Sequence, residues 1–322
     1  MWKKLKDTFP IVIIDKLSKT LLKRRDNLNQ DFELKELGPI KYFQCRELDN
    51  TNLVVNAFST RLGGVSKSPF NSLNLSYQVN DKENCVLENR KIISDILNIN
   101  YRSMTSAQQV HKDKITVVKE EDKGKGAFTS SEAIKESDAL ITNLPEIPLL
   151  MCYADCVPIF ILDPIKKVIG LIHSGRKGTE LELTLKTLFK METIFGTTPR
   201  SCLTAIFPSI GPCCYNIKFQ DETANYCLSK DNFNSKVVSK RNKGSWYLDL
   251  KKANYWQLVK GGVEEKNIFV NEICTADHPE LFFSYRRDKG NTGRMAAIFM
   301  LQNEGSKKGG EYANKRAPYS GI

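Results

Sequence analysis

Cys156 and His173 are the two residues most clearly placed to do chemistry together. Cys156 directly precedes the apolar run 157–162, and His173 directly follows the apolar run 168–172. Runs of this length that are rich in Ile and Val are typical of buried strands. If they pair as an antiparallel hairpin with Val157 opposite His173, the cysteine lies beside the histidine, since directly opposed Cβ atoms are roughly 5 Å apart. This separation suits two ligands of one metal ion, or a thiol and its base.

A third residue, His111, completes a candidate ligand set, and the chain has only three histidines. One thiolate and two imidazoles form a soft set appropriate to zinc, with a fourth position open for water. Copper is less favoured, because one Cys/His/His cluster cannot supply the ligands of a trinuclear copper centre. The alternative is a Cys156 nucleophile with a histidine as base. Asp155 is a candidate to move protons or orient an imidazole, unless strand alternation turns it away.

A second candidate region is the loop 59–66, which follows the strand-like run 52–58. Its paired glycines allow positive φ and close backbone approach to a ligand. Arg61 in this loop carries a planar donor fork suited to phosphate or carboxylate. We therefore expect an anion site at Arg61, the alternative being a glycine turn with a solvated arginine.

Composition limits the remaining classes. The chain has 322 residues, is 41% hydrophobic, and lacks both a secretory signal and the roughly 20-residue apolar run of a membrane span, so we expect a cytoplasmic protein. Its nine cysteines lack a framework spacing, which favours reduced thiols. We interpret the adjacent Cys213 and Cys214 as packing thiols, because neighbours cannot easily point at one metal. The formal charge of +11 is dispersed and accompanies no nucleic-acid-binding motif, so specific nucleic-acid binding is not expected.

The elements that position these residues predict one α/β domain of mixed sheets flanked by helices. We expect an N-terminal extension over 1–40, a catalytic domain over 41–302 and a disordered tail over 303–322. Within the extension, residues 11–25 have the spacing of an amphipathic helix, which either docks on a surface or acts in organellar targeting. Helices are expected at 82–97, 179–195 and 248–263, and strands at 52–58, 115–118, 138–142, 147–153, 157–162, 168–172, 201–207 and 268–274, with a further apolar run ending at 301.

Eleven short motifs occur in the order found in one known family. They are FSTRLGGVS (58–66), SLNL (72–75), NR (89–90), QVH (109–111), DALIT (138–142), ADCVP (154–158), HSGRKGT (173–179), PSIGPCCY (208–215), CT (274–275), FFSYRRD (282–288) and TGR (292–294). On these motifs the chain resembles the YfiH-type family, also called the multicopper polyphenol oxidoreductase or laccase-like family, purine nucleoside phosphorylase and peptidoglycan editing factor.

The resemblance implies a compact α/β fold similar to cysteine-hydrolase-like domains, and a metal site at His111, Cys156 and His173. It implies phosphorolysis of purine nucleosides (inosine, guanosine, adenosine, methylthioadenosine) to base and ribose 1-phosphate, with adenosine deamination as a further activity. A peptidoglycan-precursor amidase and a polyphenol oxidoreductase are the alternatives. Arg61 and Asn74 match pocket positions of the family. Arg176 stands where relatives usually carry Trp, so we expect it to contact the substrate.

Overall fold

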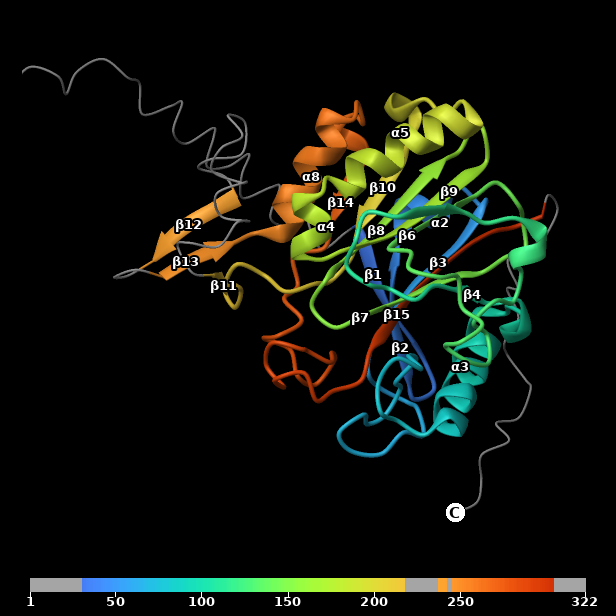
Figure 1. The fold of residues 1–322 in the computed structure, drawn as a ribbon, viewed down its shortest axis with the longest axis vertical. Coiled ribbons are helices and arrows are strands. Elements are labelled where there is room, and N and C mark those ends of the chain that lie inside the picture. Colours follow the sequence, from blue (N-terminus) through green and yellow to red (C-terminus); the bar gives the residue numbers. More distant parts are fainter. Residues whose placement is uncertain (1–30, 218–236, 242–244, 304–322) are drawn as a thin grey trace, which may run out of the picture.

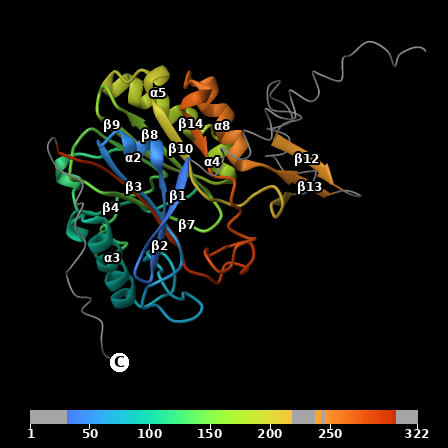
Figure 2. The same cartoon turned by 180° about the vertical axis from the view of Figure 1, so that it is seen from behind.

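Two six-stranded sheets stack face to face in the computed structural model, which describes residues 31–217, 237–241 and 245–303 (Figure 1, Figure 2). The first sheet has the order β1 (Phe32–Leu37), β2 (Ile40–Cys45), β3 (Val54–Ser59), β15 (Met295–Leu301), β7 (Leu149–Tyr153) and β4 (Thr105–Ser106). Its strands are antiparallel except for the β4–β7 pair at one edge.

The second sheet carries most of the candidate site. Its order is β14 (Ile268–Val270), β10 (Leu203–Ile206), β8 (Val157–Asp163), β9 (Val168–Ser174), β6 (Ala139–Thr142) and β5 (Ile115–Val117), with parallel pairs only at the two edges. A smaller sheet of β11 (Asn216–Ile217), β13 (Ser245–Leu248) and β12 (Val238–Arg241) projects beside α8 (Figure 1).

Five helices of the described chain flank the sheets, and the one at residues 46–50 buries Leu48 in the core between them. The helices are α2 (Arg46–Asn50), α3 (Glu83–Leu97), α4 (Arg176–Glu180), α5 (Leu183–Phe195) and α8 (Leu250–Lys260), with 3-10 turns at Tyr101–Ser103, Glu120–Asp122, Pro199–Ser201 and Glu265–Asn267. Helix α3 packs on the first sheet, whereas α5 and α8 pack on the second. The mixed α/β fold with sheets and flanking helices is therefore confirmed. None of the helices in the described part of the chain has the length and apolar character that crossing a membrane requires.

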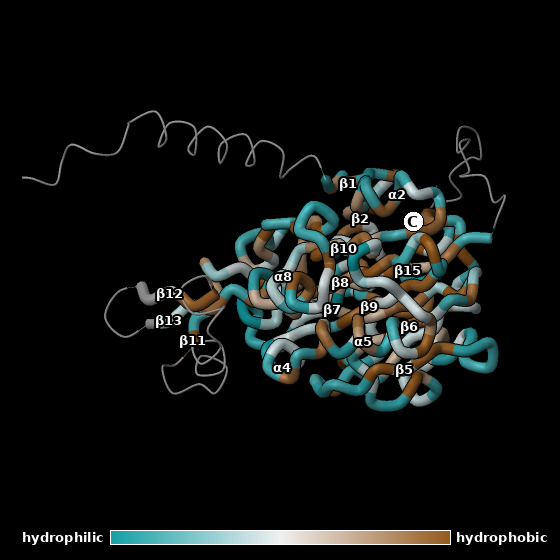
Figure 3. Tube along the Cα trace, turned by 90° about the horizontal axis from the view of Figure 1, so that it is seen from above, coloured by the Kyte–Doolittle hydropathy of each residue, from teal (hydrophilic) through white to brown (hydrophobic). Residues whose placement is uncertain are grey.

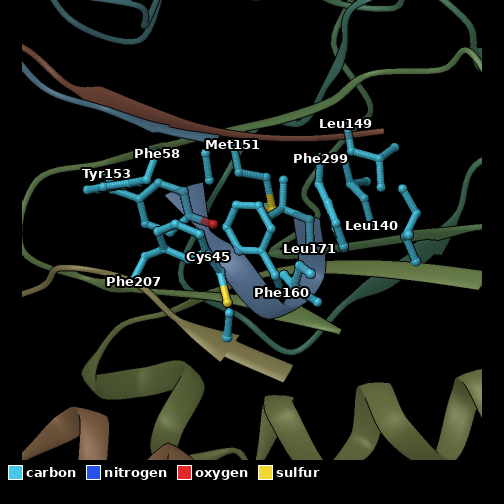
Figure 4. Packing of buried hydrophobic residues seen from close by; sticks show 14 of the residues in the cluster. Cys45, Phe58, Leu140, Leu149, Met151, Tyr153, Phe160, Leu171, Phe207 and Phe299 are labelled. Carbon is cyan, nitrogen blue, oxygen red and sulfur yellow. The ribbon is translucent and has the colours of Figure 1, made fainter. Parts of the chain in front are cut away.

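The main core lies between the sheets. Phe160 of the second sheet packs against Phe207 and Phe299, with ring centroids 4.4 and 4.8 Å apart (Figure 4). On β8, Phe160 and Leu162 belong to this core, while Ile159 and Ile161 belong to the cluster beneath α5 and α8. Burial on both faces explains why these strands are continuous apolar runs. The hydropathy colouring in Figure 3 likewise places hydrophobic positions mainly within the body and hydrophilic ones at its periphery.

The β8–β9 hairpin differs by one position from the expected register. Val157 pairs with Ser174, and His173 pairs with Pro158. The cause is an even-numbered loop of four residues, 164–167, closed by the Asp163–Val168 pair. Asp163 fixes this turn because its Oδ1 accepts hydrogen bonds from the backbone N–H groups of residues 165 and 166, at 2.9 and 3.0 Å. Cys156 still lies next to β8 at the end where β9 carries His173.

One expected helix differs from the structure, and the domain boundary expected at residue 41 stays a prediction. The helix expected at 179–195 is interrupted, because Glu182 has a φ of +55° and separates α4 from α5. The start of the domain at residue 41 falls inside the β1–β2 hairpin, whose turn contains Gly38 at a φ of +60°. Residues 32–35 alternate between apolar and charged side chains, as an edge strand does. The amphipathic helix predicted at 11–25 and the tail from 304 lie outside the described residues.

Candidate metal centre

The structure brings His111, Cys156 and His173 together. One ligand atom from each lies within 4.8 Å of the others, and Cys156 Sγ is 3.8 Å from His111 Nε2. The two imidazole rings stand edge to face, with centroids 4.9 Å apart. His173 is buried, Cys156 half-buried and His111 exposed. The cluster therefore opens to solvent on one side, as a metal site that receives a substrate requires.

Asp138, the residue before β6, organises the cluster. Its Oδ1 is 2.9 Å from His173 Nδ1, and its Oδ2 accepts hydrogen bonds from the backbone N–H groups of Val110 and Lys112, at 3.1 and 2.9 Å. Because Nδ1 of His173 is engaged in this way, Nε2 is left for the ligand position. One fully buried carboxylate thus orients one histidine and holds the loop that carries the other.

The His111 loop is also anchored from its other side. The side chain of Gln109 donates to the carbonyl of Cys152 and accepts from its N–H, both at 2.8 Å, so it extends the edge of β7. His111 itself has a φ of +59°, a left-handed conformation that is uncommon for residues other than glycine. These bonds from Gln109 and Asp138 stabilise this conformation and turn the imidazole toward Cys156.

Gly175 provides the space for the thiol. A Cβ atom at this position would lie 2.6 Å from Cys156 Sγ and 3.5 Å from His111 Cδ2. Its φ of −80° is accessible to any residue, so close approach rather than backbone conformation requires glycine here.

The Cys156 thiol and the His173 imidazole shift each other's pKa in opposite directions. Burial opposes ionisation of Cys156, but the charges and hydrogen bonds of His173 and His111 outweigh it and lower the pKa of the thiol to about 6. Burial likewise disfavours protonation of His173, yet Cys156 and Asp138 raise its pKa to about 9. In the metal-free protein the pair is therefore a thiolate and an imidazolium near neutral pH, and the thiolate is the form that binds metals.

Asp155 directs its carboxylate to a different part of the chain. Its Oδ1 accepts from the Thr275 hydroxyl at 2.7 Å, and its Oδ2 accepts from the Ser284 hydroxyl and the Arg286 N–H at 2.9 and 2.7 Å. Burial raises its pKa. Asp138, not Asp155, makes the hydrogen bond that orients an imidazole. Asp155, with a φ of +89°, instead joins the turn before β8 to the segment 275–286.

A cavity of about 710 Å³ adjoins the cluster. This volume lies within the range of roughly 300–1,000 Å³ that is typical of small-molecule sites. Its lining comprises Ser76, Gln78, Gln109, His111, Cys152, Ala154, Asp155, Cys156, His173, Arg176, Lys177, Tyr215, Tyr285, Arg286 and Arg294. Four of these side chains are cationic, and the only acidic one, Asp155, is already bound by three donors. The cavity is therefore suited to an anion.

The structure separates two of the expected site residues from this cavity. The guanidinium of Arg61 donates to the carbonyls of Asn71 and Pro279, at 2.9 and 3.2 Å, and lies over the Phe283 ring. Asn74 is fully buried, and its amide binds Asp81 and the backbone of Ser76. Neither lines the cavity. Arg176, at the first position of α4, does line it.

Sequence reasoning missed Asp138 and Arg294. From the sequence, Asp138 was expected only as the first residue of the strand at 138–142. A carboxylate at the start of a strand that neighbours a metal-binding histidine is a typical orienting partner. Arg294 Nη1 donates to the carbonyls of Thr292 and Gly293, at 2.6 and 3.0 Å, and its position in the cavity depends on β15, far along the chain.

The fold and cluster define a member of a known family. The family described as "Multi-copper polyphenol oxidoreductase laccase" matches residues 55–302, and the chain belongs to it. Its YfiH-type assignment is thereby confirmed.

Individual relatives share most of the chain. It is 36% identical over 255 residues to "Purine nucleoside phosphorylase YlmD" of Bacillus subtilis (strain 168), covering 79% of this chain and 90% of that protein. The YlmD protein of Geobacillus stearothermophilus is 35% identical over 252 residues, covering 78% of this chain and 91% of that one. Among solved structures, YfiH from Bacillus licheniformis aligns with a TM-score of 0.79 at 34% identity, over 84% of this chain and 99% of that one. YlmD from Geobacillus stearothermophilus aligns with a TM-score of 0.79 at 32% identity, over 84% of this chain and 99% of that one.

Proposed function

We propose that this protein is a purine nucleoside phosphorylase, which transfers the ribosyl group of a purine nucleoside to phosphate. The observation that carries this proposal is the cavity in which the His111/Cys156/His173 cluster shares the lining with four cationic side chains. The curated relatives named purine nucleoside phosphorylase support it. In the reaction a phosphate oxygen forms a bond to C1′ of the ribose. The bond between C1′ and the base nitrogen breaks with its electrons going to the base, which then takes up a proton.

The cationic residues provide the phosphate subsite in this proposal. Arg286 and Arg294 approach from the segment before β15, and Lys177 from the start of α4. Arginine is suited to phosphate because its planar fork forms two charge-assisted hydrogen bonds at once. Arg286 also lies over the Tyr215 ring, 4.6 Å from its centroid, which fixes the guanidinium at the cavity wall. Arg61 has no part in this subsite.

The aromatic residues provide the subsite for the base. Tyr215 and Tyr285 both line the cavity, and the side chain of Tyr285 is exposed. Stacking of a base on such a ring is worth roughly 1–3 kcal/mol. Arg176, which stands where relatives usually carry Trp, can stack through its guanidinium and adds a positive charge. Gln78 and Gln109 supply amides for hydrogen bonds to the sugar or the base.

His111, Cys156 and His173 would hold a zinc ion. The residues fit it, because they offer one thiolate and two imidazoles and because Gly175 leaves space around the thiol. When bound, zinc supplies a Lewis acid that stabilises developing negative charge. Asp138 keeps His173 in the tautomer whose Nε2 faces the cluster, and Gln109 holds the His111 loop against β7.

A cysteine hydrolase or amidase is the second candidate, and one observation favours it. Cys156, His173 and Asp138 form a thiol, imidazole and carboxylate series, with the thiol pKa lowered to about 6. Such a series can activate a cysteine for attack on an acyl carbon. Adenosine deamination is less well supported, because Asp155, the carboxylate nearest in sequence to the ligands, is engaged by three donors.

The experiment is a product assay on inosine and adenosine, with and without phosphate, and on a muramyl-L-serine precursor. We expect free base and ribose 1-phosphate only when phosphate is present, and loss of this activity after chelation with recovery upon adding zinc. Release of free ribose at the same rate without phosphate would contradict the proposal. Cleavage of the amide, blocked by thiol alkylation and insensitive to chelation, would instead establish the cysteine hydrolase. Formation of inosine and ammonia from adenosine reports deamination separately.

A further inference from the structure

A second cluster of metal-binding side chains lies apart from the candidate metal centre. It consists of Cys213, Cys214, Cys274 and Asp277, whose ligand atoms all lie within 4.8 Å of one another. The Asp277 carboxylate receives both adjacent cysteines, with Cys213 Sγ 2.9 Å from Oδ2 and Cys214 Sγ 2.8 Å from Oδ1. The expectation that neighbouring cysteines point to different places is therefore wrong. None of these residues belongs to the His111 cluster.

The chain builds this cluster from two loops that follow neighbouring parallel strands. After β10, a tight turn places both cysteines on one side, because the N–H groups of Cys214 and Tyr215 each bond to the carbonyl of Gly211, at 3.1 and 3.0 Å. After β14, Cys274 forms a parallel bridge with Ser209, which aligns the second loop with the first. Backbone hydrogen bonds thus fix the turn that carries Cys213 and Cys214 and align it with Cys274.

Gly211 lies at the centre of this arrangement. Its N–H donates to Cys274 Sγ at 3.1 Å, a hydrogen bond that stabilises a thiolate. A Cβ atom on Gly211 would lie 3.1 Å from Cys213 Sγ and 3.2 Å from Cys274 Cβ, so a larger residue would crowd both cysteines. The glycine therefore allows the three sulfur atoms to converge.

The chemistry of the four side chains selects the ligand. Three thiols and a carboxylate provide four donors, a number that completes tetrahedral coordination of zinc without an open position. Thiolates are soft ligands that favour zinc over magnesium or calcium. Without a cation, ionisation of these groups would bring four negative charges within 4.8 Å of one another. We propose that Cys213, Cys214, Cys274 and Asp277 bind a structural zinc ion, separate from the metal at His111, Cys156 and His173.

This zinc would fix one wall of the cavity. Thr275, next to the ligand Cys274, donates to Asp155, and Tyr215, next to the ligand Cys214, lines the cavity. The zinc would therefore join the loop that bears Tyr215 to the loop whose Thr275 forms a hydrogen bond with Asp155. Its role is to stabilise the fold and position the wall, and it does not take part in the reaction.

The first test is elemental analysis of the full chain purified without chelators. The number of zinc ions per chain is compared between the wild type and the double variant Cys213→Ser/Asp277→Asn. Both substituted positions are exposed. We expect a loss of about one zinc per chain. Cys156→Ser should lose the other zinc, and Cys85→Ser, which alters a half-buried cysteine outside both clusters, should lose none. A double variant that keeps the wild-type zinc content would overturn the proposal.

A second measurement on the wild type guards against misfolding of the variant. In the metal-depleted protein we expect Cys213, Cys214 and Cys274 to be alkylated, and added zinc to protect them while Cys85 still reacts. Equal alkylation with and without zinc would refute the site. A thiol count under denaturing, non-reducing conditions that falls two short would show a disulfide in place of the metal. Cobalt loading adds a check, because three thiolates give intense charge-transfer absorption that the double variant should largely lose.

Discussion

Asp138 and His173 are joined through Oδ1 and Nδ1 at 2.9 Å, and the second oxygen of the same carboxylate binds two N–H groups of the His111 loop. A single buried carboxylate therefore controls the orientation of both histidines. The protein needs this control because the two imidazoles come from different parts of the sheet: His173 lies on β9, and His111 lies on the loop before β5.

Replacing Asp138 by Asn should lower zinc affinity at the candidate metal centre by about 10–100-fold. The asparagine side chain lacks the negative charge that favours the His173 tautomer. It also places an NH2 group, itself a donor, where the carboxylate accepted hydrogen bonds from His173, Val110 and Lys112. Competition with a chelating dye measures the affinity. Asp163→Asn is the matched control, since Asp163 is equally buried but holds the turn at the far end of the β8–β9 hairpin. Equal losses in both variants would mean that general destabilisation is responsible.

The variant Gly175→Ala should lose metal at the same centre, because its Cβ would overlap Cys156 Sγ at 2.6 Å. Overpacking of this kind destabilises by about 1–3 kcal/mol. The control is Gly178→Ala in α4, where the nearest atom to a Cβ is Ser174 Oγ at 3.3 Å. Zinc content and thermal unfolding of both variants are measured. Full zinc content in Gly175→Ala would show that the thiol can move aside and still bind.

Phosphate binding should depend on Arg294 and not on Arg61. A hydrogen bond to a charged group is worth about 1.5–3 kcal/mol, so Arg294→Ala should raise the KM for phosphate by about tenfold or more. Arg61→Ala should leave this KM unchanged and lower stability, since its guanidinium binds two backbone carbonyls and covers Phe283. Steady-state kinetics at saturating nucleoside, with zinc content as a check, compare the two. The reverse pattern would restore Arg61 as the anion ligand.

In the metal-free protein, the thiolate of Cys156 should form near pH 6, far below the usual range of a cysteine. His173, with its pKa raised to about 9, favours folding below its unfolded pKa, and this contribution is lost as pH rises through about 9. Cys156, with its pKa lowered, favours folding at high pH, and this contribution is lost as pH falls through about 6. The ion pair therefore stabilises the metal-free fold between about pH 6 and 9.

The measurement is the ultraviolet absorbance of thiolate across pH in chelated wild type and Cys156→Ser, together with the free energy of unfolding of both. The destabilisation caused by Cys156→Ser should be largest within that pH window. A thiolate that forms only above pH 8 would show that His173 and His111 do not perturb it.

The strands were predictable because their apolar runs face hydrophobic layers on both sides. Ile159 and Phe160 are consecutive in sequence yet belong to opposite cores. Because both faces of the strand are buried, its sequence is a continuous apolar run, which is readily recognised as a buried strand. The exact hairpin register was not predictable, because it depends on whether the loop after Asp163 has an odd or even number of residues. Sequence pattern alone does not distinguish these loops.

Side-chain roles were harder to predict because they depend on partners distant in sequence. Arg61 has the donor geometry for phosphate, but the carbonyl of Pro279, 218 residues away, occupies one of its donors. Asp138 becomes important only where folding brings His173 and the His111 loop to it. The convergence of Cys213 and Cys214 likewise requires Asp277, from a loop more than 60 residues later.

Strand β15 lies at the centre of the first sheet, between β3 and β7, although it is the last strand of the described chain. During synthesis on the ribosome, β3 and β7 emerge long before the strand that joins them, so each has an unpaired edge until residue 301 is available. Such edges are templates for pairing with other chains. A nascent chain interrupted before Met295 would therefore be prone to aggregation, and chaperones that bind exposed strands have their main period of action before β15 is complete.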